Sequence, residues 1–76
     1  MSMNLAFEFS GVIIDFPFQT PTTLSRAVMK AKGLQQRLDL IEAELKNWGW
    51  PKEDIDEMLT KCRRSMTNKN FKLVMI

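Results

Sequence analysis

An alternation of apolar with other residues on both sides of the dipeptide Ser10-Gly11 constrains this chain more than any other feature of its sequence. Period-two patterning is typical of half-buried strands, and glycine tolerates the positive φ that a tight hairpin turn needs. A two-residue loop also sets the register, because a slip of one residue would turn every side chain to the opposite face. The pairs predicted to share one face are Phe9 with Val12, Phe7 with Ile14 and Leu5 with Phe16.

The segment after the hairpin predicts helix, with Thr20 as N-cap and Pro21 at the first helical position. Its apolar stripe, at spacings of three and four, consists of Leu24, Ala27, Ala31, Leu34, Leu38, Ile41, Leu45 and Trp48. Gly33 leaves two alternatives, which are one helix to about Trp48 or two helices with a break at Lys32-Gly33. We favour the break, because a helix of about 28 residues would be roughly 42 Å long and would overhang so small a domain.

The last third of the chain predicts one more helix and a final strand. Gly49 is expected to follow the end of the preceding helix, and Pro51 to start the next one. Helical spacing puts Ile55, Met58, Leu59, Cys62 and Met66 on one apolar face. Residues 67–70 read as a turn and residues 71–76 as a strand. We therefore expect a single α+β domain over residues 1–76, of order ββα(α)αβ. The hairpin and the C-terminal strand would form a small antiparallel sheet with two or three helices on one face.

Composition excludes several classes of function. The chain has no histidine and one cysteine, so a disulfide within the chain, a Cys/His metal cluster and a histidine-activated nucleophile cannot form. We expect no enzyme and no cofactor. The longest apolar run, Val12 to Ile14, is far shorter than the roughly 20 residues of a membrane-spanning helix. A single unpaired cysteine is typical of the reducing cytosol, so we expect a complete, cytoplasmic gene product with no membrane partner.

Two tryptophans and the single cysteine are candidates for binding or reactive groups. Cys62 falls on the apolar face of its helix and is interpreted as a small core hydrophobe. Trp48 continues the apolar stripe and is expected in the core. Trp50 lies off the stripe, which leaves two alternatives open: a binding anchor, or a filler packed over the corner at Pro51.

Charged residues offer two further interpretations. Asp39, Glu42 and Glu44 fit a solvated helix face, with Glu42 paired to Lys46 four residues later. A possible nucleic-acid surface consists of Lys61, Arg63, Arg64, Lys69 and Lys72, in a segment without acids. Helical geometry spreads the first three over roughly 160° of the wheel, and cations near a helix C-terminus complement its dipole. We therefore prefer the interpretation that these cations complement the helix dipole. Glu57 and Lys61 are expected to form another surface pair.

The predicted architecture leaves one sheet face without helices. That face would carry Ala6, Glu8, Ile13, Asp15, Pro17, Lys72, Val74 and Ile76, and it is more apolar than solvation requires. We therefore expect a non-enzymatic protein-binding protein, an inhibitor or adaptor, with Ile13, Asp15, Trp50, Lys72 and Val74 as partner-binding candidates. Self-association is also expected, because so short a chain buries only about 60% of its unfolded surface.

Two alternatives to protein binding remain open at this point. The first is nucleic-acid binding through the five basic residues named above, and the second is a small-ligand pocket formed at an oligomer interface. In size and style, but by no motif, the chain is similar to the small regulators with which phages and mobile elements block host systems. The sequence identifies neither the partner nor the pathway.

Overall fold

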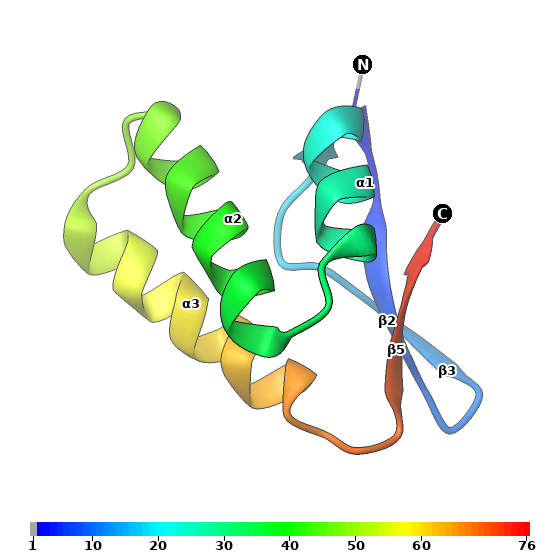
Figure 1. The fold of residues 1–76 in the computed structure, drawn as a ribbon. Coiled ribbons are helices and arrows are strands. Elements are labelled where there is room, and N and C mark those ends of the chain that lie inside the picture. The colour runs from blue at the N-terminus through cyan, green and yellow to red at the C-terminus, as the bar shows by residue number, and fades with distance from the viewer. Residues whose placement is uncertain (1) are drawn as a thin grey trace.

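The computed structural model describes residues 2–76, which form three helices and five short strands in two antiparallel sheets (Figure 1). In chain order the elements are β1 (Ser2–Met3), β2 (Leu5–Phe9), β3 (Val12–Asp15), β4 (Thr20–Pro21), α1 (Thr22–Lys30), α2 (Leu34–Asn47), α3 (Lys52–Met66) and β5 (Phe71–Met75). The predicted α+β class is confirmed. The sequence missed only β1 and β4, which are two residues long and carry no alternation.

β2 is the central strand of the larger sheet, whose order is β3-β2-β5. The predicted hairpin register is confirmed, since Phe9 pairs with Val12 and Phe7 with Ile14. Ser10 and Gly11 have φ values of 52° and 82°, which are typical of the type I′ turn that matches strand twist. β5 pairs antiparallel with the other edge of β2, so the first and last segments of the chain are neighbours.

The predicted N-cap at Thr20 is wrong by one residue. Thr20 pairs with Met3 in the small β1–β4 sheet, and its buried hydroxyl donates to the Met3 carbonyl oxygen at 3.1 Å and contacts the Ser25 hydroxyl. Pro21 is the N-cap instead, with φ −60° and ψ 150°. Pro51 is likewise the N-cap of α3 rather than its first residue. Proline fixes φ near −65°, which suits an extended cap as well as a helix, so the sequence alone leaves this choice open.

The helix breaks at Gly33, as we favoured. α1 ends at Lys30 and α2 begins at Leu34, with Ala31 in an extended conformation between them. Arg37 bridges the break: its Nη2 donates to the Ala31 carbonyl oxygen at 3.1 Å, and its guanidinium lies 5.6 Å from the ring centroid of Phe71. This contact attaches the α1–α2 junction to β5, and nothing in the sequence pattern indicated it.

The helices cover one side of the larger sheet, and the core lies between these layers (Figure 1). The buried cluster consists of Leu5, Phe7, Phe16, Leu24, Val28, Leu38, Ile41, Leu45, Ile55, Cys62 and Met66. Phe7 and Phe16 contact each other across the hairpin, with ring centroids 4.6 Å apart. The predicted apolar face of α3 is confirmed by Ile55, Cys62 and Met66, each at most 2% exposed.

Substituting serine at Gly11 and at Gly33 distinguishes the effect of backbone strain on stability from the effect of steric clash. A Cβ would meet no atom within 4 Å at Gly11 or Gly33, but only Gly11 has a positive φ. We expect Gly11→Ser to lower the free energy of unfolding by about 1–2 kcal/mol. Gly33→Ser should raise it by about 0.5–1 kcal/mol, since the hydroxyl can cap α2 and serine restricts the unfolded chain. Urea titration followed by circular dichroism measures both, and equal losses would contradict the explanation.

Candidate protein-binding surface

The most exposed apolar segment is β3. Val12 is 59% exposed, Ile13 53% and Ile14 49%, so aliphatic side chains project on both sides of this strand. Val12 and Ile14 were predicted to face the helices, and their pairing with Phe9 and Phe7 does place them on that side. They are exposed nevertheless, because β3 is an edge strand that lies beyond the helix layer (Figure 1).

The backbone of β3 is open along its outer edge. The Phe16 amide donates to the Leu5 carbonyl oxygen at 2.9 Å, which sets the phase of hydrogen bonding between the two strands. Since bonded and non-bonded pairs alternate in an antiparallel ladder, Ile14 turns its N–H and C=O toward β2. Ile13 and Asp15 turn theirs outward. Charges and bulges usually protect such an edge, but here Asp15 is the one charged residue of the strand.

The open sheet face brings together four of the five predicted partner-binding residues. The pairings of β2 with its two neighbours align Lys72, Glu8 and Ile13 in one row across the sheet. They align Val74, Ala6 and Asp15 in the next row. The Lys72 ammonium lies 3.4 Å from a Glu8 carboxylate oxygen, so these charges are paired.

The other residues of this face differ in how exposed they are. Ala6 was predicted to be exposed but is fully buried, because its short methyl group lies on the central strand between longer neighbours. Val74 is half-buried, whereas Ile76 is 53% exposed beyond the end of β5. Apolar side chains are therefore exposed at both edges of this face, Ile13 on β3 and Ile76 beyond β5.

Trp50, the fifth predicted residue, lies at the α2–α3 corner and not on this face. Its ring packs against Phe18 with centroids 6.2 Å apart, and it lies partly buried against the core. Trp48, which was expected in the core, is 38% exposed, and its indole N–H donates to a Glu44 carboxylate oxygen at 2.9 Å. Gly49, with φ 82°, lies in the turn between the two tryptophans, and the Trp48 ring also contacts Phe18, with centroids 6.0 Å apart.

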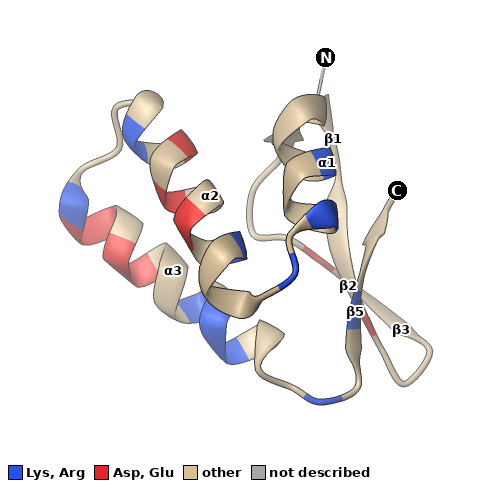
Figure 2. Cartoon of the chain, viewed as in Figure 1, with Lys and Arg blue, Asp and Glu red and all other residues tan. Residues whose placement is uncertain are grey.

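The five basic residues of the nucleic-acid alternative are distributed over α3, the following turn and β5, and two of them are in ion pairs. Lys61 is paired with Glu57 at 3.7 Å, as predicted, and Lys72 lies on the sheet beside its own acidic partner. Arg63 and Arg64 are exposed at the C-terminal end of α3, and Lys69 is in the following turn. Figure 2 shows the positive residues of this region interrupted by tan segments between the helix, the turn and the strand.

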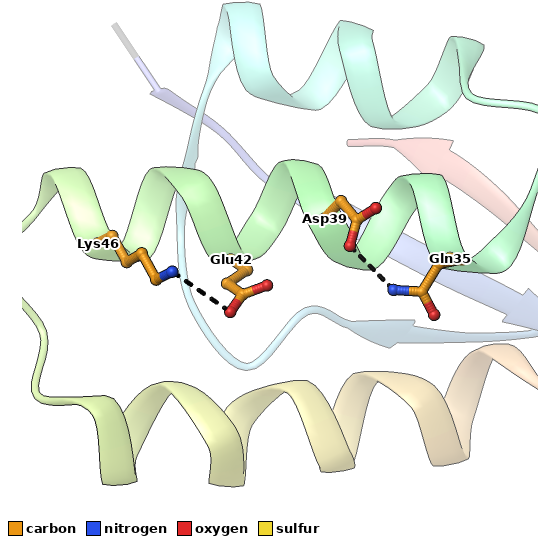
Figure 3. A network of polar contacts seen from close by, with 4 residues as sticks. All are labelled: Gln35, Asp39, Glu42 and Lys46. Atoms are coloured by element: carbon orange, nitrogen blue, oxygen red, sulfur yellow. Dashed lines mark hydrogen bonds and ion pairs between the residues drawn. The ribbon is translucent and has the colours of Figure 1, made fainter.

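The acids of α2 form local pairs on a solvated helix face. Glu42 lies 3.6 Å from Lys46, and the Gln35 amide donates to Asp39 at 2.9 Å (Figure 3). The predicted Glu42–Lys46 pair is thus confirmed. Residues 2–76 contain no group of three or more side chains placed to hold a metal ion.

A shallow hollow of about 310 Å³ lies where α2 and α3 meet. It is lined by Glu42, Lys46, Trp50, Lys52, Ile55 and Asp56. Four of these six residues are charged, whereas small-ligand sites are mostly apolar. The hollow is therefore unlike a typical small-ligand site, and the small-ligand alternative, a pocket at an oligomer interface, stays a prediction.

Cys62 is a core side chain, only 1% exposed between α3 and its neighbours. Burial raises the pKa of its thiol from the ordinary 9.0 to about 11. A nucleophilic cysteine needs the opposite shift, because the thiolate is the reactive form.

None of the helices in the described part of the chain has the length and apolar character that crossing a bilayer requires. Comparison of the chain with protein-family models, curated proteins and solved structures finds no match.

The pKa shift of Cys62 predicts a loss of stability at high pH. Its folded-state pKa is raised, so the contribution is complete below pH 9 and is lost as the pH rises towards about 11. A shift of this size corresponds to about 2–3 kcal/mol of unfolding free energy. Urea titrations across this range measure it. Cys62→Ala should be less stable at neutral pH but should lose less on going to high pH, and parallel curves would contradict the prediction.

The scattered cations predict no useful affinity for nucleic acid. We expect no binding to random duplex or single-stranded DNA or RNA at physiological salt, measured by fluorescence anisotropy. A dissociation constant of about a micromolar or tighter would contradict this, provided that it weakens steeply with salt and is abolished by reversing Arg63 and Arg64 to Glu.

Proposed function

We propose that this chain is a small, non-enzymatic protein-binding protein, an inhibitor or adaptor, which contacts its partner through β3 and the adjoining open sheet face. The observation that carries the proposal is the run of Val12, Ile13 and Ile14, each about half exposed on an edge strand. Three adjacent exposed aliphatic residues are uncommon where a strand has no partner.

The backbone supports the same conclusion independently of the side chains. The outward N–H and C=O groups of Ile13 and Asp15 can form hydrogen bonds with an added strand, as in recognition by strand addition. In this mode the main chain supplies affinity, and alternate side chains supply specificity. Ile13 and Asp15 would then face the partner from one side of the sheet, and Val12 and Ile14 from the other.

Protein is a better partner for this surface than nucleic acid or a small molecule. Glu8 and Lys72 neutralise each other at 3.4 Å, so the face has little net positive charge to attract phosphate. β3 is an exposed edge strand, whereas a small ligand binds in a concave site that buries most of its surface. An extended protein segment satisfies both the apolar side chains and the unpaired backbone groups.

A lysine at Ile13 tests the proposal. This side chain is 53% exposed, so Ile13→Lys should change the free energy of unfolding by less than about 0.5 kcal/mol. In a complex the same charge would be buried without a partner, so affinity should fall by at least about a hundredfold. Ser65→Lys places a similar charge on an exposed position of α3 and serves as the matched control.

The measurement has two stages. Affinity capture from the native host identifies proteins retained by the unmodified chain and by Ser65→Lys but not by Ile13→Lys. A purified candidate is then titrated against all three by isothermal calorimetry. Equal affinity for Ile13→Lys would refute the β3 surface, and unfolding of this variant would place Ile13 in the core.

A further inference from the structure

We infer that the partner of the β3 edge is a second copy of this chain, paired antiparallel through β3 about a two-fold axis at Ile14. This inference rests on the proposed function, because it names the occupant of the same surface. The product would be one continuous six-stranded sheet of order β5-β2-β3-β3-β2-β5.

Hydrogen-bond geometry selects this register. The free donors and acceptors of β3 belong to Ile13 and Asp15, which are two residues apart. When two copies run antiparallel, Ile13 of one lies opposite Asp15 of the other, and each pair exchanges two N–H···O=C bonds. The two-fold axis then passes between the two copies of Ile14, and all four outward groups of each strand are satisfied.

The side chains on the helix-facing side match themselves in this register. Ile14 lies directly opposite its own copy, and Val12, which is 59% exposed, lies opposite Phe16 of the partner subunit. Pairs of β-branched residues, and of a β-branched residue with an aromatic ring, are favourable cross-strand combinations. Every cross-strand pair on this side is apolar, which is the self-complementarity that a two-fold interface requires.

The other side carries the one unfavourable term. The partner's Ile13 lies opposite Asp15, and the two copies of Asp15 approach each other diagonally across the axis. These like charges weaken association, so removing the carboxylate should strengthen it.

The ends of the pairing are also defined by the sequence. Pro17 has no N–H, so in this register it can only accept from Gly11 of the partner subunit, and the ladder ends there. At the other end of β3, the hairpin turn at Ser10-Gly11 ends the ladder between the two copies. Because the paired segment extends only from Gly11 to Pro17, we expect an interface smaller than the standard of about 800 Å² per partner, and association should require micromolar or higher concentrations.

Two substitutions of one residue provide a matched test. Asp15→Ala and Asp15→Pro both remove the carboxylate, but only proline removes the outward N–H. Neither disturbs the bonds of β3 to β2, since this N–H points away from that strand. Sedimentation equilibrium from low micromolar to millimolar concentration should show dimerisation of the unmodified chain, tighter dimerisation of Asp15→Ala, and dimerisation of Asp15→Pro weaker by about tenfold or more.

A measurement on the unmodified chain keeps the test independent of any folding defect. The amide protons of Ile13 and Asp15 should exchange rapidly with solvent in dilute samples and become protected at high concentration. The amide of Ile14, bonded to β2, should be protected in both. Circular dichroism and thermal melting check that both variants remain folded.

The outcomes separate this inference from the proposed function. Dimerisation of Asp15→Pro as tight as that of Asp15→Ala would overturn edge pairing and indicate stacking of open sheet faces. A monomer at every concentration would overturn the second copy as occupant, while a partner lost with Ile13→Lys would preserve the proposed function. If Ile13→Lys affects neither self-association nor partner capture, both fail.

Discussion

The pairing of β2 on both of its edges is the interaction on which the rest of the structure depends. Leu5 and Phe7 place their side chains in the core, and the backbone of the same strand alternates its hydrogen bonds between two neighbours. The Phe16 amide reaches Leu5 on one side at 2.9 Å, and the Ile76 amide reaches Asn4 on the other at 2.9 Å. One strand therefore joins the start, the hairpin and the end of the chain.

The placement of the helices follows from this arrangement, and so does the exposure of β3. α3 returns to the sheet through a short turn and delivers β5 to one edge of β2, while Arg37 attaches the α1–α2 junction to Phe71 of the same strand. These contacts draw the helix layer towards β5 and away from β3. Val12 and Ile14 thus remain exposed although they share a face with buried Phe7.

The proposed use of the β3 edge is compatible with a sequence that carries no functional motif. Catalysis and metal binding require particular side chains at particular spacings, so such sites can be recognised as motifs in a sequence. Recognition by strand pairing relies on backbone groups that every residue except proline possesses. Such a surface can be recognised only from the exposure of its side chains and from the position of Pro17. Both can be interpreted only once the strand order is known.

Local signals predicted much of this fold. The hairpin register follows from alternation about Ser10-Gly11, the helix break from Gly33, and the corner from Gly49, because each depends on backbone preferences over a few residues. Four of the candidate surface residues could also be assigned to one face, since alternation along paired strands sets their facing. β1 and β4 were missed, as two-residue strands have no period to detect.

Only the tertiary structure decided which residues of the predicted faces are covered. Val12 and Ile14 have the pattern of core residues, yet the helices do not reach them, whereas Ala6 is buried by its neighbours in the sheet. Trp48, which was expected in the core, is 38% exposed, and Trp50, for which the sequence left two alternatives, is partly buried against the core. Periodicity determines which way a side chain points, but burial depends on what packs against it, and that is set by contacts between segments distant in the chain.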